Sequence, residues 1–379
     1  MKWPQVELGE VLQPVKDSAT IIPQRLYRQI TVRLFGKGVI ERGKIVGSDI
    51  GSKQYTASEG QFIISKIDAR NGAFGLVPQE LDGAVVTGDF LLFKCAQPLE
   101  PKFLAYLSTT PFFVDECVKS SVGSTNRVRL NPTKFMGIKI PLPPLSEQQR
   151  LTAKLEQVQT TVAEIKRLRT EQQNELRLLL RRQFREAIAD APRLPLGQVA
   201  PIVRRPVEVD TTAIYPELGV RSFGRGTFHK PPTIGADVTW QKPYWLRADD
   251  LLFSNIKAWE GAVAVVAAED DGRIASHRYI TCVADPSVAL SRFLLYYLLT
   301  PEGIEKINDA SPGTADRNRT LGTAALNKIE VPVPSLATQQ AFLDLQTRID
   351  MLTTAQNTAQ EELGLLLPAA LDKAFKGEL

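Results

Sequence analysis

The sequence contains two copies of one long unit, and this internal repeat constrains the fold more than any other feature. The motif LGEV at residues 8–11 returns as LGQV at 196–199, and IPLPPLSEQQ at 140–149 returns as VPVPSLATQQ at 331–340. Between them, matched residues keep their order and spacing: Tyr27, Val32, Arg33, Phe35, Gly36 and Gly38 match Tyr215, Val220, Arg221, Phe223, Gly224 and Gly226, and Arg127-x-Arg129 matches Arg317-x-Arg319. The offset stays at about 190 residues, so a whole domain with its connector has been copied once.

Each copy begins with a mixed globular part. Short runs of β-forming residues, such as QFII at 61–64 and DDLLF at 249–253, are broken by glycine and proline turns. Apolar residues then fall at helical spacing within residues 101–107 and 291–299. We therefore expect two tandem α+β domains.

Each copy ends in a long helix. After the prolines at 141–144 the apolar residues recur at alternating steps of four and three, which is typical of a coiled-coil seam. The predicted seam residues are Leu151, Leu155, Val158, Val162, Ile165, Leu176 and Leu179 in the first helix, and Phe342, Leu345, Ile349, Leu352, Leu363 and Leu366 in the second. A capping box at 146–149 should begin the first helix, which would span about 60 Å, and Pro368 should bend or end the second. Two such helices favour mutual antiparallel pairing, although packing of each helix on its own domain remains the alternative.

The composition excludes several classes of protein. The formal charge of +4 and the pI near 8.8 permit nucleic acid as a partner without requiring it. The three cysteines are too few for a disulfide framework, and neither histidine lies near a cysteine at metal-ligand spacing, so no metal site is expected. Without a signal peptide or a long apolar run, we expect a soluble cytoplasmic protein with no membrane contact.

No catalytic motif stands out, so we expect no enzyme activity in the chain itself. The tetrapeptide with which amino-methyltransferases hold an extruded base is missing, and residues 131–134 (NPTK) only approach it. Gly38, Gly43 and Lys44 imitate a phosphate-binding loop, but Ile45 stands where a hydroxyl would have to reach magnesium.

Several motifs resemble the specificity subunits of type I restriction-modification systems. They are IKIPLPPLSEQQR at 138–150, GSTNR at 123–127, SKIDARNGA at 65–73 and AFKGEL at 374–379. The second copy departs from the pattern at 337–338 (AT for SE) and 311–316 (SPGTAD), which leaves its recognition loop less certain. The resemblance implies target recognition domains at 1–145 and 191–336, with conserved helices at 146–190 and 337–379.

The resemblance also implies the partners. Each domain would recognise one half of a bipartite, asymmetric site in double-stranded DNA, and the paired helices would set the gap and dock two methyltransferase subunits. A restriction and translocase subunit would join them. The cofactors S-adenosylmethionine, ATP and magnesium belong to those partners, and none is expected in this chain.

Candidate DNA-binding residues are those that can neutralise phosphates or pair with base edges beside glycine or aromatic residues. In the first copy they are Lys37, Arg42, Lys44, Lys53, Gln54, Lys66, Arg70, Asn71, Asn126 and Arg127. In the second they are Arg221, Arg225, Lys230, Asn255, Lys257, Trp259, Arg278, Arg317 and Arg319. Residues that differ between the copies, as DARN at 68–71 differs from KAWE at 257–260, are the better candidates for sequence recognition, because the half-sites differ.

Two other functions remain open at this stage. The chain could be a coiled-coil scaffold whose domains bind protein, in which case binding would show no steep salt dependence. It could also be a specificity subunit of a related DNA-modification or phage-defence system with other partners.

Overall fold

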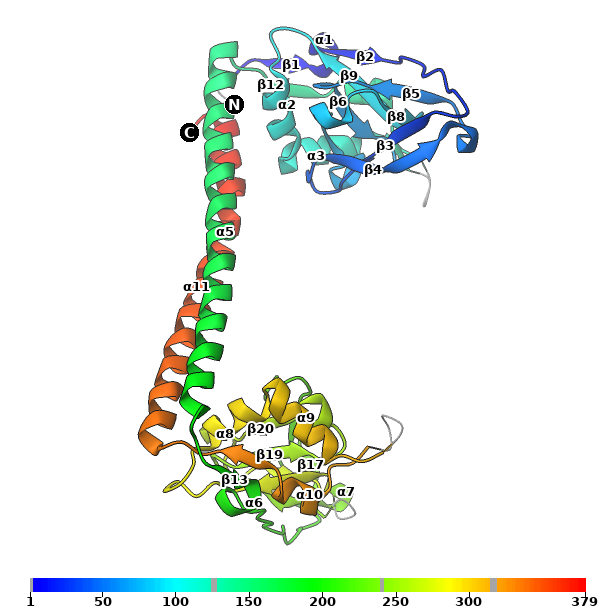
Figure 1. The fold of residues 1–379 in the computed structure, drawn as a ribbon. Helices are drawn as coiled ribbons and strands as arrows, with labels where there is room; N and C mark the ends of the chain where they lie inside the picture. The colour runs from blue at the N-terminus through cyan, green and yellow to red at the C-terminus, as the bar shows by residue number, and fades with distance from the viewer. Residues whose placement is uncertain (1–2, 124–127, 239–241, 314–318) are drawn as a thin grey trace. The chain divides into compact units, whose positions relative to one another are not determined.

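The computed structural model describes residues 3–123, 128–238, 242–313 and 319–379 (Figure 1). The chain divides into two compact units: unit 1 comprises residues 1–169 and 356–379, and unit 2 comprises residues 170–355. Each unit therefore contains one globular domain and a stretch of each long helix. No helix in the described ranges is long and apolar enough to cross a membrane.

The domain of unit 1 is built on two four-stranded sheets, with strand orders β2-β9-β6-β7 and β4-β3-β8-β5, and two small ribbons, β1-β12 and β10-β11. Its strands are β1 Gln5–Glu7, β2 Leu12–Val15, β3 Leu26–Val32, β4 Val39–Val46, β5 Gln54–Ala57, β6 Phe62–Ser65, β7 Phe74–Leu76, β8 Ala84–Thr87, β9 Phe90–Cys95, β10 Ser121–Val122, β11 Arg129–Leu130 and β12 Lys139–Pro141. Its helices are α1 Leu8–Val11, α2 Pro101–Ser108, α3 Pro111–Lys119 and α4 Pro132–Met136, with 3-10 turns η1 Gly47–Asp49, η2 Ala69–Asn71 and η3 Gln79–Leu81.

The domain of unit 2 repeats much of this order with shorter strands. They are β13 Arg193–Pro195, β14 Ile214–Tyr215, β15 Leu218–Val220, β16 Thr227–His229, β17 Thr233–Ile234, β18 Tyr244–Trp245, β19 Leu251–Ser254, β20 Val263–Val265, β21 Ile274–Ala275, β22 Tyr279–Cys282 and β23 Glu330–Pro332. The central sheet has the order β20-β19-β22, which matches β7-β6-β9 of unit 1. The helices are α6 Leu196–Val199, α7 Gly235–Val238, α8 Ser291–Leu298, α9 Pro301–Asp309 and α10 Thr323–Asn327, with 3-10 turns η5 Ala258–Glu260 and η6 Ala268–Asp270.

Two long helices complete the fold: α5, Leu145–Ile188, and α11, Leu336–Lys376. In unit 1 they run antiparallel, because the Arg150 guanidinium donates to the backbone oxygen of Leu379 (2.8 Å) while Arg169 donates to Gln360 (3.4 Å). The prediction of α+β domains, each followed by a long helix that pairs with the other, is confirmed.

Each domain core continues into the paired helices. In unit 1 the side chains of Leu151, Leu155, Leu371 and Ala374 belong to the same buried cluster as those of the sheet and of α2. In unit 2 the Phe184 ring of α5 packs on Phe293 of α8, with ring centroids 5.3 Å apart. The end of each long helix is therefore part of the other copy's core.

Of the thirteen predicted seam residues, ten are buried or half-buried and three are exposed. Phe342, Ile349 and Leu363 are buried as expected. Leu352 and Leu366 are 51% exposed. Leu179 is also exposed, and Leu180 and Leu367 pack inward in place of Leu179 and Leu366. The remaining predicted residues, Leu151, Leu155, Val158, Val162, Ile165, Leu176 and Leu345, are buried or half-buried.

One prediction about the helix ends is wrong. Ser146 is the second residue of α5, so it cannot cap the helix that the capping box was expected to begin. Of the two effects predicted for Pro368, a bend or an end of the helix, the end does not occur, because α11 continues through Pro368 to Lys376. The carbonyl that a proline leaves without its donor lies four residues earlier, at Gly364, which is exposed and can be hydrated.

A buried glutamine fastens the start of each long helix to its domain. The Gln148 amide group donates to the carbonyl oxygens of Pro98 (2.8 Å) and Pro143 (2.9 Å), and its oxygen accepts from the Glu100 N–H (2.9 Å). In unit 2, Gln339 makes the same three bonds, to Val288, Pro334 and Leu290. The repeated Gln-Gln pair thus contains one glutamine that locks the junction.

Candidate nucleic-acid interface

Both units hold one turn, residues 66–73 in unit 1 and 255–262 in unit 2, on the same backbone framework. We call the turn the recognition turn and the framework the shared frame. In unit 1 the Lys66 N–H donates to the Asp89 carbonyl (2.8 Å), and the Lys66 carbonyl accepts from the Leu130 N–H (2.8 Å). In unit 2, Asn255 makes the equivalent bonds to Arg278 (2.8 Å) and Leu321 (2.7 Å). The shared frame therefore brings together three segments in each unit: the β6–β7 or β19–β20 turn, the start of β9 or β22, and the segment that leads to α4 or α10.

A glycine loop with an exposed phenylalanine lies against each recognition turn. We call residues 33–38 and 221–226 the Phe loops of units 1 and 2. Phe35 and Phe223 are 75% and 70% exposed and have φ angles of +60° and +63°. A bulky side chain rarely adopts this left-handed backbone, which costs about 1–3 kcal/mol where the surrounding structure enforces it.

The same backbone bonds enforce that conformation in both units. The Phe35 N–H donates to the Asn71 carbonyl (2.7 Å), and the Phe223 N–H donates to the Glu260 carbonyl (2.8 Å). Gly72 permits the close approach, since a Cβ there would lie 3.2 Å from the Cα of Phe35. The two Phe loops are thus built alike.

Each Phe loop also carries two basic residues. Lys37 and Arg225 lie over the rings of Phe35 and Phe223, at 5.9 and 5.7 Å from the ring centroids. The Arg33 guanidinium donates to the Lys37 carbonyl in its loop (2.6 Å). The Arg221 guanidinium donates to the Thr227 carbonyl in the strand that follows its loop (2.6 Å). These two arginines brace the loops.

In unit 1 the structure brings part of the predicted set together. Lys66, Arg70 and Asn71 lie on the recognition turn, and Lys37 lies on the Phe loop that bonds to it. Arg42 and Lys44 are exposed on β4, at one edge of the β4-β3-β8-β5 sheet, and Lys53 immediately precedes β5 at the other edge.

One candidate of unit 1 is wrong. Gln54 is 4% exposed and donates to Ser52, so it cannot reach a base edge. Asn126 and Arg127 lie outside the described residues.

In unit 2 most of the predicted residues lie on or beside the shared frame. Asn255, Lys257 and Trp259 belong to the recognition turn, Arg278 immediately precedes β22, and Arg221 and Arg225 belong to the Phe loop. Lys230 forms an ion pair with the buried Glu217. Arg317 lies outside the described part of the chain.

The Trp259 ring is held in place at the surface of unit 2. Its indole N–H donates to the Ile256 carbonyl (3.1 Å), and Lys257 and Arg319 lie 5.1 and 4.9 Å from its ring centroid. Lys257 also bonds to Glu260, and this bond lowers the pKa of the Glu260 carboxyl group. The ring belongs to none of the buried clusters, so it does not roof the core.

The structure changes one match between the two copies. Arg129 directly precedes Leu130, whereas Arg319 stands two residues before Leu321, which occupies the place of Leu130 in the shared frame. Thr320, not Arg319, is therefore the partner of Arg129 at this end of the loop. The segment between Ala310 and Leu321 in unit 2 is one residue longer than the segment between Ser120 and Leu130 in unit 1.

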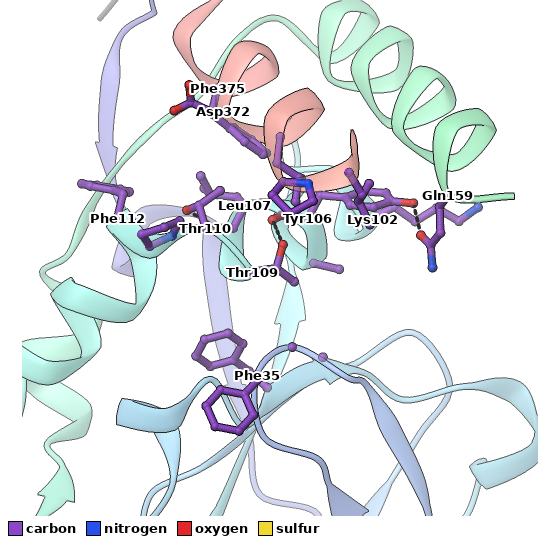
Figure 2. Close-up of a pocket in the computed structure, with 18 of the residues that line it drawn as sticks. Phe35, Lys102, Tyr106, Leu107, Thr109, Thr110, Phe112, Gln159, Asp372 and Phe375 are labelled. Atoms are coloured by element: carbon purple, nitrogen blue, oxygen red, sulfur yellow. Dashed lines mark hydrogen bonds between the residues drawn. The ribbon is translucent and has the colours of Figure 1, made fainter. Parts of the chain in front are cut away.

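An apolar groove of about 860 Å³ lies within unit 1, between the Phe loop, helices α2 and α3, and the end of α11 (Figure 2). Figure 2 shows Phe35 on the opposite side of the groove from Phe375. The four charged side chains in its lining form two ion pairs, Lys102 with Glu156 (2.6 Å) and Lys376 with Asp372 (2.7 Å). Such a neutral, apolar surface is suited to a protein partner more than to phosphates.

The polar chemistry of the described residues does not include a metal site or a reactive thiol. No cluster of metal-ligating side chains occurs among them. Burial raises the pKa of Cys117 and Cys282 to about 12 and that of Cys95 to about 11, so these thiols stay protonated near neutral pH.

Comparison with known proteins gives a consistent result. A family described as "Type I restriction modification DNA specificity domain" matches residues 1–174. The chain is similar to the HsdS subunit from Thermoanaerobacter tengcongensis, with 25% identity, a TM-score of 0.67, and coverage of 100% of this chain and 97% of that one.

A second solved chain is similar to the same extent. It comes from a structure described as "Structural basis underlying complex assembly and conformational transition of the type I R-M system", with 25% identity, a TM-score of 0.71, and coverage of 100% and 98%. No curated protein matches the sequence.

Proposed function

The chain belongs to the family of specificity subunits of type I restriction-modification systems, and on this premise we propose that it recognises a bipartite, asymmetric site in double-stranded DNA. Subunits of this family are non-catalytic. The observation that carries the proposal is the shared frame, on which matched positions bear different side chains: Arg70 and Asn71 in unit 1, Trp259 and Glu260 in unit 2. Two similar domains with different recognition turns suit two half-sites of different sequence.

The proposal assigns sequence recognition to the turns and phosphate contact to the basic residues around them. Lys37, Lys66 and Arg225 are exposed or half-exposed and lie beside a turn, where they can approach the DNA backbone. Binding should then weaken steeply as salt rises, because each neutralised phosphate releases counterions.

The catalytic work belongs to the partners. We assign adenine N6 methylation to two methyltransferase subunits with S-adenosylmethionine, and cleavage to a restriction and translocase subunit with ATP and magnesium. Since the partners act on chromosomal and invading DNA, the complex would work in the cytoplasm.

Exposed apolar side chains on the long helices support methyltransferase docking there. Helix pairing leaves Leu168, Leu365 and Leu366 exposed in unit 1, and Leu178, Leu179, Met351 and Leu352 exposed in unit 2. Such residues are normally found at protein interfaces when they gather on one element. Each unit thus offers an exposed apolar surface on its long helices that one methyltransferase subunit would cover. In unit 1 the apolar groove adds to this surface.

The decisive experiment is a genome-wide map of methylated adenines in cells with and without the gene. We expect a bipartite motif of two short half-sites around a fixed gap, present only with the gene. Identical maps in the two strains would contradict the proposal. If binding by the assembled complex does not weaken as salt rises, the scaffold function is favoured instead.

The helices are proposed to set the gap between half-sites. Removing one heptad from α5 and the facing heptad from α11 shortens each helix by about 10 Å, which corresponds to roughly three base pairs. The mapped gap should shrink by that amount while both half-sites keep their sequence. A variant with one heptad replaced by another of equal length is the control, and an unchanged gap after the deletion would refute this role.

A further inference from the structure

The position just before β9 in unit 1 and β22 in unit 2 is structurally equivalent in the two copies. Asp89 and Arg278 hold it, and each offers its carbonyl to the first residue of the recognition turn, Lys66 or Asn255, at the same 2.8 Å. The strands that follow pair alike, Ser65 with Phe90 and Ser254 with Tyr279. An acid in one copy therefore stands where the other copy has a base.

In unit 1 this acid is neutralised by the loop that faces it. The Arg129 guanidinium bonds to the Asp89 carboxylate at 2.6 Å, and both side chains are partly exposed. Arg129 directly precedes Leu130, which the shared frame holds against Lys66. Unit 1 thus presents a closed, neutral ion pair at this position.

In unit 2 both members of that pair are replaced. Arg278 stands in place of Asp89, and Thr320 stands in place of Arg129. Arg319 turns away: it donates to the carbonyls of Ser311 and Asn308 (3.3 Å each) and stacks on Trp259. Unit 2 therefore has neither the acid nor its arginine partner at these two positions, and Arg278 adds one positive charge there.

Arg278 is a basic group at this surface that forms no ion pair with the described residues. Its side chain is exposed, and within the described parts of the chain it has no carboxylate partner. The nearby bases are engaged, since Lys230 pairs with Glu217 and Lys257 pairs with Glu260. A small polar pocket of about 270 Å³, lined by Ser254, Ser276 and Arg278 among others, opens beside it.

We propose that Arg278 is a specificity-determining residue of unit 2, and that it recognises a guanine through the O6 and N7 atoms of the base. The inference rests on the proposed function and adds one contact to it. A guanidinium presents two parallel donors that match this pair of acceptors in the major groove. A contact to phosphate is disfavoured because phosphates are the same in both half-sites, whereas this position is reversed in charge between the two units.

The test uses the full chain assembled with its methyltransferase partners, after the parent site has been mapped. Duplexes carry that site with each base pair varied in turn, and binding is measured for the parent, Arg278→Ala and Arg278→Lys. We expect Arg278→Ala to lose about 5- to 150-fold of discrimination at one G·C pair of one half-site, with the other half-site unchanged. Arg278→Lys keeps the charge but not the paired donors, so it should also lose discrimination there.

Two outcomes would overturn the inference. Equal weakening on every duplex, with a salt dependence reduced by about one charge, would make Arg278 a phosphate contact. Unchanged discrimination at every position would give it no role. Lys328→Ala, at an exposed position just after α10 in the same unit, lies outside the shared frame and the long helices; it is the matched control and should bind as the parent does. If the parent complex shows no bipartite site, the proposed function fails before the variants are tested.

Discussion

The buried glutamine at each helix junction gives the sharpest test of how the domains are held. Replacing Gln148 by Ala removes three hydrogen bonds; it leaves the carbonyl of the buried Pro143 without this donor, and the part-buried Glu100 N–H and Pro98 carbonyl without their partner. An unsatisfied buried group costs about 1–3 kcal/mol, so we expect unit 1 to lose about 3–5 kcal/mol of unfolding free energy. Gln339→Ala should cost unit 2 the same, because its three bonds are equivalent.

Hydrogen exchange measured by mass spectrometry under increasing denaturant can assign the loss to one unit. Peptides of unit 1 should lose protection in Gln148→Ala while peptides of unit 2 keep it, and the reverse should hold for Gln339→Ala. The neighbouring Gln149 is exposed, so Gln149→Ala should stay within about 0.5 kcal/mol of the parent. A cost below about 1 kcal/mol for Gln148→Ala, or equal losses in both units, would refute the reasoning.

The variant Gln148→Glu tests the same geometry through pH. Its carboxylate would face the carbonyls of Pro98 and Pro143, which receive the two donor hydrogens of the native amide. Burial and these oxygens should raise the folded-state pKa above the unfolded value of about 4.3. The variant should then approach the stability of the parent below that pH and fall behind it as pH rises through the folded-state pKa. A stability difference that does not change between pH 4 and 7 would show that the site is open to water.

Three further predictions follow from the packing. Phe184→Ala removes a ring that touches three others in unit 2, and it should cost that unit about 3–5 kcal/mol, whereas Leu178→Ala on the exposed side of α5 should cost little by chemical denaturation. Cys117 and Cys282, whose pKa values burial raises to about 12, should not react with a thiol reagent at pH 8 until the protein unfolds; reaction of the native protein would contradict their burial. Gly72→Ala places a methyl group 3.2 Å from the unit 1 Phe loop at a φ of +72°, so thermal unfolding should show a loss of about 1–3 kcal/mol, and an unchanged melting temperature would show that the loop is not held by this turn.

The repeat and the long helices could be predicted from the sequence because both depend on patterns that extend over many residues. The sequence could not predict which residue of each turn faces inward along the seam. Leucines at 178–180 and 365–367 occupy three consecutive positions, so the sequence offers every choice of inward residue and the pattern cannot select one. Packing selects Leu180 and Leu367, whose side chains contact the domain cores of units 2 and 1.

The structure changes the role assigned to the junction motif at the start of α5. The sequence suggests a capping box led by Ser146, whereas the working residue is Gln148, which points into the domain. Two of the three partners of that glutamine, Pro98 and Glu100, are about 50 residues earlier, and a local pattern contains no information about them.

At the candidate interface, too, the local sequence carries no information about distant contacts. Residue type alone placed Gln54 among the DNA contacts, although a four-residue strand buries it. The exposed Phe35 and Phe223 stood in the matched motif from the start, but hydrophobic character predicts burial, and only the turn that fixes their left-handed backbone explains their exposure. The extra residue before Leu321 was hidden because two arginines at equal spacing gave a plausible but wrong alignment.

The chemistry of the shared frame explains how one domain can serve two recognition tasks. The bonds of the frame that both units share are donated by a backbone N–H to a backbone carbonyl, as at Lys66 and Asn255, so these bonds do not depend on which side chain is present. They therefore do not restrict the type of side chain at these positions. Unit 1 has the Asp89–Arg129 pair where unit 2 has Arg278 and Thr320, within a framework whose hydrogen-bond lengths agree to within 0.1 Å. On the proposed function, we therefore expect positions that vary between the two copies to contact the DNA, and positions that agree, such as Phe35 and Phe223, to hold the frame.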